Sequence, residues 1–486
     1  MASTPQAAAQ QSQAAPPLCV DLDGTLIRTD VLWESLVRLL ARNPLYLVAV
    51  VVWWMRGRAH LKAELARRVQ LDVAAQPYHP EFLQWLRQQK AAGRDLYLVT
   101  ASDVRLAGAV ADHLGLFTEV LASDGRHNLR GKAKGARLAE RFGDAGFDYA
   151  GNSSVDLPVW ERGRRAIVVN ASERLARRAA RRATVENVFA ARESGLGAFW
   201  RGLRPYQWVK NLIVLVPAIT SHRLTEPAVA LDALIAFVAF CLCASGVYLL
   251  NDLLDVESDR HHAAKRERPF ARGDLPLPVG LAAFPLLLLG SLLIGTSLSQ
   301  GFVATLGVYV LLTTAYSLRL KQAPLLDVFC LAGLYTVRLV AGHEATGIVY
   351  SFWLLVFSMF LFLSLALVKR GVELEAARQQ NRNDIKGRGY AAGDLPLITI
   401  LGCCSAFLAV LVLALYVNSQ EVRILYRHPT LLLLICPLLL YWMSRLWLLA
   451  ARGRMHDDPV VFALRDPVSY AVGALTLAVI WLATGA

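Results

Sequence analysis

The stretch VALDALIAFVAFCLCASGVYLLNDLLDVESD, residues 229–259, joins an apolar segment directly to an acidic cluster. Residues 229–250 are almost entirely apolar, and a helix of roughly 20 such residues crosses the hydrocarbon core of a bilayer. The polar side chains of Asn251, Asp252, Asp255 and Asp259 follow at once. Because charged groups at a membrane are costly and usually functional, we expect a membrane protein with a site at the end of this span.

Further apolar segments of similar length follow the same pattern. The chain is 55% hydrophobic and only 18% charged, which is too apolar for an ordinary soluble protein. The expected fold is an all-α bundle of about nine transmembrane helices over residues 206–486, although the first candidate is short and starts with polar residues. The candidates are 206–221, 229–250, 280–298, 301–319, 324–342, 350–369, 395–417, 428–449 and 467–485.

The basic residues predict the orientation of these spans. With the amino terminus inside, loops assigned to the cytoplasm hold sixteen Lys and Arg residues, including Arg382 and Lys386, whereas outer loops hold only Arg223, Arg423 and Arg427. This distribution follows the positive-inside rule and predicts a bacterial inner membrane protein with cytoplasmic active-site loops. The net charge of +13 therefore indicates anionic membrane lipids as partners and not nucleic acid, since no basic and aromatic binding face accompanies it.

The acidic cluster has the chemistry of a magnesium site. Asp252, Asp255 and Asp259 recur at i, i+3 and i+7, so they share one face if the helix continues. Mg²⁺ takes one or two carboxylates and completes its shell with water and phosphate oxygens. Basic residues suited to phosphate follow in the same loop, at Lys265 and Arg268 among others.

Residues 200–486 resemble the UbiA-type intramembrane prenyltransferase superfamily. Asn251 to Asp259 matches its first aspartate-rich motif, which in that family holds Mg²⁺ against a diphosphate. Family members that prenylate aromatic rings carry a second aspartate-rich motif after the sixth span. This chain has Leu367-Val368-Lys369-Arg370-Gly371-Val372-Glu373 there. Lys and Arg bind phosphate without a bridging metal.

With that difference, the chain resembles a narrower branch of the superfamily, the decaprenyl-phosphate phosphoribosyltransferases. Two further stretches carry the same resemblance: Arg204-Pro205-Tyr206-Gln207-Trp208-Val209-Lys210-Asn211 and Tyr316-Ser317-Leu318-Arg319-Leu320-Lys321. The resemblance implies that a polyprenyl phosphate attacks phosphoribosyl diphosphate, with Asp252 and Asp255 as catalytic residues. Asn251, Asp252, Asp255 and Asp259 would hold Mg²⁺. The implied phosphate or substrate contacts are Lys210, Asn211, Lys265, Arg268, Tyr316, Lys321, Asp327, Arg338, Lys369, Arg370 and Glu373.

Simpler interpretations of these residues stay open. Lys210 is compatible with a snorkelling lysine at a helix start, and Lys369-Arg370 with positive-inside anchoring. Asp327 is equally compatible with a ribose contact and with an ion pair to Lys321.

The amino-terminal part has a different pattern. Residues 1–17, rich in Ala, Gln and Pro, predict a disordered tail and not a signal peptide. Strand signals at 18–20, 96–100, 147–151 and 166–170 alternate with helical segments, which predicts a soluble parallel α/β domain of Rossmann-like type over 18–185 and a linker over 186–205.

This part resembles the haloacid dehalogenase (HAD) superfamily, on four motifs that occur in the family's order: Asp21 and Asp23, Thr100, Lys134, and Asn152 to Asp156. The resemblance implies that Asp21 attacks phosphorus and that Asp23 protonates the leaving oxygen. Thr100 and Lys134 would hold phosphate. Asp21, Asp23, Asn152 and Asp156 would bind Mg²⁺, although the family usually has aspartate where this chain has Asn152. Lys132 is an alternative to Lys134.

Two further segments near or within this domain suggest membrane contact. Residues 44–55, twelve mostly apolar residues with two Trp, predict a cap helix lying on the membrane; a buried core helix is the alternative. Residues 174–182 predict a basic helical linker, drawn to anionic lipid or simply solvated.

The two parts together suggest a hypothesis. The membrane domain would form polyprenyl-phosphoryl phosphoribose from a polyprenyl phosphate and phosphoribosyl diphosphate, and the HAD domain would remove its 5-phosphate in a pathway of cell wall biosynthesis. The alternatives are a UbiA-type transfer of an isoprenyl group to an aromatic acceptor, and a lipid-binding or transport protein without catalysis. The oligomeric state stays open and includes homo-oligomers.

Overall fold

The computed structural model describes residues 15–125, 127–190, 195–262, 264–380, 388–455 and 458–485. Most of the expected tail, residues 191–194 of the expected linker, and Arg382 and Lys386 lie outside these ranges. The chain forms two compact units. The first contains the residues up to Gly202 together with Asp252–Ala282, and the second contains Leu203–Asn251 and Ala283–Ala486.

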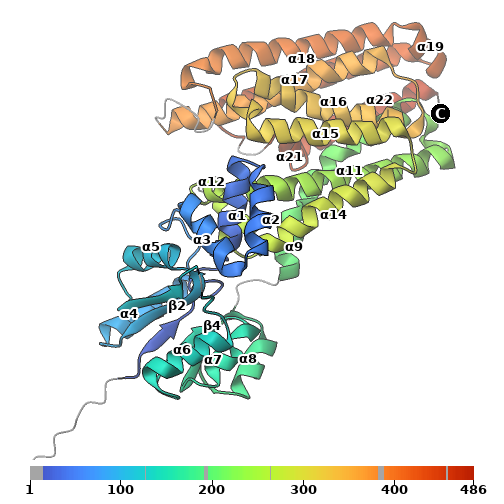
Figure 1. The fold of residues 1–486 in the computed structure, drawn as a ribbon. Helices are drawn as coiled ribbons and strands as arrows, with labels where there is room; N and C mark the ends of the chain where they lie inside the picture. Colours follow the sequence, from blue (N-terminus) through green and yellow to red (C-terminus); the bar gives the residue numbers. More distant parts are fainter. Residues whose placement is uncertain are drawn as a thin grey trace, which may run out of the picture. The chain divides into compact units, whose positions relative to one another are not determined.

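A parallel sheet of six strands organises the first unit, in the order β3-β2-β1-β4-β5-β6 (Figure 1). Parallel pairing needs crossover connections, which the helices between the strands supply. Strand β6 continues the sheet beyond residue 185, where the domain was expected to end. The strands are β1 (Leu18–Val20), β2 (Leu96–Asp103), β3 (Glu119–Ser123), β4 (Asp148–Gly151), β5 (Arg165–Ala171) and β6 (Thr184–Ala190).

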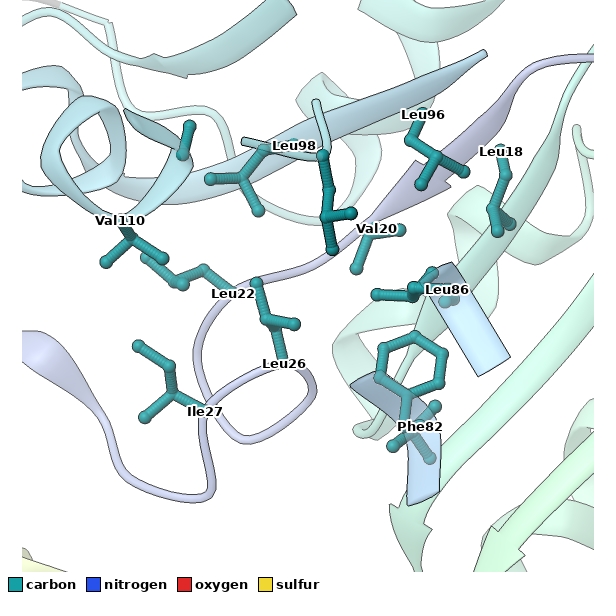
Figure 2. Packing of buried hydrophobic residues seen from close by; sticks show 14 of the residues in the cluster. Leu18, Val20, Leu22, Leu26, Ile27, Phe82, Leu86, Leu96, Leu98 and Val110 are labelled. Carbon is teal, nitrogen blue, oxygen red and sulfur yellow. The ribbon is translucent and has the colours of Figure 1, made fainter. Parts of the chain in front are cut away.

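Both faces of the sheet are covered, which explains why its central strand is apolar throughout. Leu18 and Val20 of β1 point to one core and Cys19, between them, points to the other. Figure 2 shows the first core, where Phe82 and Leu86 pack against the strand residues. The covering helices are α4 (Pro80–Ala91), α5 (Val104–Leu114), α6 (Lys132–Phe142), α7 (Leu157–Trp160) and α8 (Glu173–Ala180).

Helix α8 corrects the expectation of a basic linker at 174–182. Its Ala179 is fully buried, and Leu175 and Ala176 pack against the same core. Arg177 faces solvent and pairs with Glu173. The segment is therefore a covering helix of the α/β domain with a solvated basic face.

Three helices between β1 and β2 form a cap: α1 (Val31–Arg42), α2 (Tyr46–Met55) and α3 (Arg58–Arg68). Helix α2 is apolar all round but buries only one face, through Trp53 and its neighbours, against α1 and α3. Val48, Trp54 and Met55 are 60% or more exposed. The alternative of a buried core helix is therefore wrong, whereas the membrane contact of α2 stays a prediction.

The second unit is helical, and the described part of the chain holds eight helices long and apolar enough to cross a membrane. The leucines they expose, such as Leu311 and Leu477, suit contact with lipid. The spans are α11 (Pro227–Leu254), α14 (Leu277–Gly295), α15 (Gln300–Leu318), α16 (Leu326–Thr346), α17 (Phe352–Gln379), residues Ala392–Val417 with α18 (Leu395–Val417), Pro429–Ala451 with η7 (Pro429–Leu434) and α20 (Ile435–Ala451), and α22 (Pro467–Thr484).

The first of the nine expected spans, 206–221, is not among these eight. It forms a 3₁₀ helix, η2 (Pro205–Leu215), followed by the short α10 (Val216–Thr220). At ~2.0 Å per 3₁₀ residue and ~1.5 Å per α-helical residue, the two together measure about 30 Å. An α-helix of the same residues would measure only about 24 Å. The stretched helix thus gives this short segment the length of a bilayer core.

A close contact holds three spans of the second unit together. A Cβ added to Gly402 of α18 would lie 1.9 Å from Cζ2 of Trp447 on α20. The Trp447 indole nitrogen donates to Ser364 Oγ of α17 (3.1 Å), and that hydroxyl donates to the Gly402 carbonyl (2.7 Å). Only glycine allows this approach, so Gly402 is a packing residue.

The loop after α11 belongs to the first unit and contains α12 (Val256–Arg260), η4 (Lys265–Glu267) and α13 (Pro269–Arg272). Helix α11 ends at Leu254 and α12 begins at Val256, so Asp255 lies in a break. The three carboxylates therefore do not occupy one continuous helical face. The prediction of a shared face required a continuous helix through Asp255, which the break excludes.

Candidate active sites

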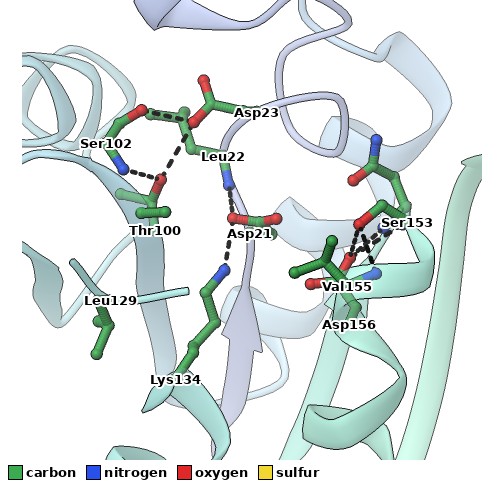
Figure 3. Close-up of polar contacts among 12 residues, drawn as sticks. Asp21, Leu22, Asp23, Thr100, Ser102, Leu129, Lys134, Ser153, Val155 and Asp156 are labelled. Atoms are coloured by element: carbon green, nitrogen blue, oxygen red, sulfur yellow. Dashed lines mark hydrogen bonds and ion pairs between the residues drawn. The ribbon is translucent and has the colours of Figure 1, made fainter. Parts of the chain in front are cut away.

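The first candidate site lies at the carboxyl end of β1. Asp21 and Asp23 follow the strand, and Gly24 turns the chain with a φ of +73°. Asp23 Oδ1 accepts from the Val31 amide at the start of α1 (2.8 Å), and its Oδ2 accepts from the Ser102 hydroxyl (2.5 Å). Figure 3 shows Asp23 beside Thr100 and Ser102 of β2, and Asp21 beside Lys134 of α6.

A chain of buried polar contacts starts at Asp21. Lys134 Nζ donates to Asp21 Oδ1 (2.9 Å) and to the Tyr149 hydroxyl (2.8 Å), and that hydroxyl donates to Asp156 Oδ1 (3.1 Å). Lys134 is 3% exposed, whereas Lys132 faces solvent. Of the two expected lysines, Lys134 is thus the one beside the nucleophile candidate.

Asp156 and Asn152 occupy the loop after β4. Asp156 Oδ2 accepts from the amides of Asn152 (3.1 Å) and Ser153 (2.9 Å) and from the Ser153 hydroxyl (3.1 Å). The Asn152 side chain lies so close to Gly24 that a Cβ on Gly24 would come within 2.0 Å of Nδ2. Asp156 therefore stabilises the loop through these hydrogen bonds, and the Asn152 side chain lies against the turn at Gly24.

A cavity of about 700 Å³ opens above these residues, and its lining adds side chains that no motif indicated. Ser102 lines it, whereas Thr100 is fully buried and reaches Asp23 only at 3.4 Å. Lys62 of α3 also lines it and donates to the Ala101 carbonyl (2.5 Å) and to Asn128 Oδ1 (3.1 Å). Residues i and i+2 of a strand point to the same side, and Ser102 is the nearer of the two to the carboxyl end of β2.

Burial raises the proton affinity of both carboxylates. It raises the pKa of Asp21 to about 7 even though Lys134 opposes the shift. Burial, with the carboxylate of Asp30 as a second cause, raises the pKa of Asp23 to about 6. Carboxyls with pKa values near neutrality suit nucleophilic and acid–base roles, and a bound cation would favour their ionised forms.

The second candidate site is the acidic loop, residues 251–259. Arg268 Nη1 lies 3.0 Å from Asp252 Oδ1 and 2.7 Å from Asp259 Oδ2, so one guanidinium joins both carboxylates. Asp255 and Asn251 are half-buried nearby in sequence, and Lys265 is exposed. Asp252 lies on α11 and Asp259 on α12, and the guanidinium of Arg268 contacts both carboxylates across the break after Leu254.

Asp259 has a feature that suits a metal or substrate. Its Oδ1 is buried and has no hydrogen-bond partner among the described residues. Burial raises the pKa of Asp259 to about 6, and Arg268 moderates that shift. A buried oxygen without a donor is costly, so the loop fits a bound cation such as Mg²⁺.

Neither carboxylate site contains a complete metal centre of acidic side chains. In the described ranges, no three Asp, Glu, His or Cys side chains converge into a metal-binding group. At the first site the oxygen-bearing side chains that line the cavity include Asp21, Asp23, Asp30, Asn152 and Asp156. Mg²⁺ often keeps several waters and substrate oxygens, so two or three protein oxygens are compatible with it.

A basic cluster in the second unit joins segments far apart in sequence. Lys210 of η2 and Lys369 of α17 both face Asp458, with Nζ atoms 2.8 and 3.4 Å from its Oδ2. Lys210 also lies over the Tyr335 ring, 5.8 Å from its centroid. Burial acts to raise the pKa of Asp458, but Lys369 and Lys210 outweigh it and hold that pKa well below its usual value. Asp458 has no motif of its own, and the sequence did not indicate it.

Lys369 and Arg370 do not act as the pair that was expected. Arg370, fully buried, binds Asp327 and Glu373, because consecutive helical residues point in different directions. The Tyr390 hydroxyl donates to Asp327 Oδ1 (2.5 Å), and Arg388 lies 3.7 Å from Asp327 and donates to the Tyr316 hydroxyl (2.8 Å). Asp327, Arg370, Glu373 and Tyr316 thus belong to one network. Lys321 follows α15 in η5 (Leu320–Gln322).

Arg338 and Asn211 meet in the core of the bundle. Arg338 Nε donates to Asn211 Oδ1 (2.9 Å) and its Nη2 donates to the Tyr309 hydroxyl (3.2 Å). The guanidinium also stacks near the rings of Phe240, Tyr309 and Tyr335. Arg338 and Lys210 therefore both lie near the ring of Tyr335.

Two parts of the chain match known protein families. Residues 214–484 match the UbiA prenyltransferase family, and residues 18–161 match the haloacid dehalogenase-like hydrolases. The uncharacterized protein y4nM of Sinorhizobium fredii is 37% identical over 462 residues, which cover 94% of this chain and 89% of that protein. The decaprenyl-phosphate phosphoribosyltransferase of Mycolicibacterium smegmatis is 38% identical over 183 residues, which cover 37% of this chain and 58% of that protein.

A solved structure is also similar. It is described as a UbiA homolog from Archaeoglobus fulgidus bound to GPP and Mg²⁺, and it shares 16% identity with a TM-score of 0.45, covering 58% of this chain and 99% of that chain.

Proposed function

Because this chain belongs to the UbiA prenyltransferase family and carries a HAD-like domain at its amino end, we propose that it is a two-step enzyme of lipid-linked sugar synthesis. The membrane domain joins a polyprenyl phosphate to phosphoribosyl diphosphate and releases pyrophosphate. The HAD-like domain then removes the 5-phosphate to give polyprenyl-phosphoryl ribose. The phosphoribosyltransferase similarity, which covers 37% of the chain, supports the first step.

The observation that carries the first step is the convergence of Lys210 and Lys369 on Asp458. A second aspartate cluster would serve a second metal-bound diphosphate, whereas two ammonium groups suit the phosphate of a lipid acceptor. In this step an oxygen of the lipid phosphate bonds to C1 of the ribose, and the bond from C1 to the diphosphate breaks. The nucleophile is already anionic, so the step needs no general base.

The acidic loop suits the leaving group. Asp252, Asp255 and Asp259 would hold Mg²⁺, which supplies charge neutralisation for the departing diphosphate. Arg268, which joins two of these carboxylates, keeps the loop compact until substrate enters. We propose Lys265 as a further contact to the diphosphate.

The second step uses the cavity of the HAD-like domain. The Asp21 carboxylate attacks the phosphorus of the 5-phosphate, and the bond from phosphorus to the sugar oxygen breaks as Asp23 gives that oxygen a proton. Water, deprotonated by Asp23, then hydrolyses the aspartyl-phosphate and releases inorganic phosphate. Lys134 and Ser102 adjoin the two carboxylates and orient them.

We further propose an inner membrane location with both sites on the cytoplasmic side. Nine crossings, with η2 and α10 as the first, leave the amino-terminal domain and the acidic loop on the same side.

Purified protein given phosphoribosyl diphosphate and a polyprenyl phosphate tests the proposal directly. We expect pyrophosphate, then inorganic phosphate, and mass spectrometry should identify polyprenyl-phosphoryl ribose. Product from an isoprenyl diphosphate and an aromatic acid, with none from phosphoribosyl diphosphate, would overturn it.

A further inference from the structure

The acidic loop of the transferase is held by the first helix of the HAD-like domain, within the same compact unit. Arg260, next in sequence to Asp259, donates from Nη1 and Nη2 to the two carboxylate oxygens of Glu34 on α1, at 2.7 and 3.0 Å. These residues are 226 positions apart, and their side chains are only 5% and 9% exposed. The pair therefore is a buried, bidentate link and not a surface ion pair.

The partners of this pair are bonded further. Glu34 also accepts from Gln76 Nε2 (2.8 Å) and from the Thr29 hydroxyl (3.2 Å), and Arg260 Nε donates to the Ala271 carbonyl (3.1 Å). Buried charges are tolerated when their remaining hydrogen-bonding groups are satisfied, as here. Removing one partner would leave the other charged, buried and unneutralised.

Independent contacts fasten the same two segments. Arg38, one turn after Glu34, lies 3.0 Å from Glu257 of α12. A Cβ on Gly273, at a φ of +76°, would come within 2.7 Å of the Arg28 Cβ, so the end of the loop packs directly on the chain before α1. Arg28 also lies 3.9 Å from Asp274.

On the other side of α12, Asp259 faces Arg268 and Asp252. Helix α12 is only five residues long and follows the break at Asp255. So short a helix is not stable alone. Its position, and that of Asp259, depends on what it packs against.

We propose that Glu34 and Arg260 are positioning residues of the transferase site, and that the HAD-like domain has a second, non-catalytic role as the support for the acidic loop. The inference rests on the proposed function for its substrates, but not for the contact itself. It assigns the HAD-like fold a task that is separate from its phosphatase chemistry.

The test uses the full-length protein in lipid nanodiscs. Glu34→Gln keeps the side-chain shape and removes the charge, and Glu34→Arg with Arg260→Glu restores a pair in reverse. We expect Glu34→Gln to raise the Mg²⁺ concentration for half-maximal pyrophosphate release by roughly 10-fold or more, and the reversed pair to recover much of this loss. Glu119→Gln is the control, because it breaks an exposed ion pair with Arg141 in the same domain.

Limited trypsin digestion gives a readout that needs no activity. Lys265 and Arg266 are exposed trypsin sites in the loop, and their cleavage should accelerate in Glu34→Gln but not in Glu119→Gln. If wild-type protein makes no pyrophosphate, the proposed function fails and digestion alone decides the inference. Unchanged cleavage and unchanged Mg²⁺ dependence in Glu34→Gln would overturn the inference, as would a loss of folded protein with no change in the Mg²⁺ requirement.

Discussion

The shared carboxylate of Asp458 leads to a prediction about the two lysines that face it. Replacing Lys210 or Lys369 by Met removes one cation from the proposed site for the lipid phosphate. A charge-assisted hydrogen bond contributes about 1.5–3 kcal/mol, so each substitution should raise the KM for polyprenyl phosphate by roughly 10- to 150-fold. The KM for phosphoribosyl diphosphate should change little.

The double variant distinguishes this arrangement from two independent sites. When one lysine is gone, Asp458 neutralises the other, since both Nζ atoms lie within 3.4 Å of the same oxygen. The second substitution should therefore add little, and the two effects should be strongly non-additive. Adding Asp458→Asn to Lys210→Met frees Lys369 and should lower the KM again.

The assay is pyrophosphate release in detergent micelles at varied lipid phosphate, with Lys90→Met as the control for loss of a half-buried lysine in the other unit. Additive single effects would refute the reasoning about the shared carboxylate. A rise in the KM for phosphoribosyl diphosphate alone would assign the lysines to the other substrate.

Three further predictions concern the two sites and the bundle. Asp21→Asn should lower inorganic phosphate release by at least about 100-fold while pyrophosphate release continues, measured by separate coupled assays; equal phosphate release would exclude Asp21 as the nucleophile. Asp21 attacks only when ionised; burial raises its pKa to about 7 and bound Mg²⁺ lowers it again, so phosphate release at fixed Mg²⁺ should increase with pH over a range below 7. Lys134→Met removes a cation that lowers this pKa, so the rising limb of the pH profile should move to higher pH, and a shift to lower pH would contradict the assignment. Gly402→Ala places a Cβ 1.9 Å from Trp447 and should destabilise the bundle by about 1–3 kcal/mol in thermal unfolding, whereas Gly473→Ala, with open space around it, should not.

The sequence could predict what depends on neighbouring residues. Strands β1, β2, β4 and β5 follow from short apolar runs. All eight long spans of the described ranges lie where whole segments are apolar over a membrane length, with α17 running on beyond its candidate range. The acidic loop and Asp21, Asp23 and Lys134 are found because each belongs to a local pattern. Edge strands β3 and β6, whose residues are half exposed, lack the continuous apolar signal of buried parallel strands.

The sequence could not predict partners that only the fold brings together. Asp458 meets Lys210 across 248 positions, and Lys62 enters the cavity from the cap without any motif. Helical direction separates Lys369 from Arg370, although adjacency in sequence suggested a pair. The break at Asp255 depends on the contacts of α12, and no residue there breaks a helix by its own chemistry.

The ion pair of Glu34 and Arg260 also bears on how such a fused gene can evolve. A mutation that silences the phosphatase chemistry leaves that pair intact, so the chain keeps its transferase and selection need not remove the mutant. Deletion of the whole amino-terminal segment would remove Glu34 and with it the hold on α12. We therefore expect catalytic positions such as Asn152 to drift among descendants of this gene more freely than Glu34 and Arg260 do.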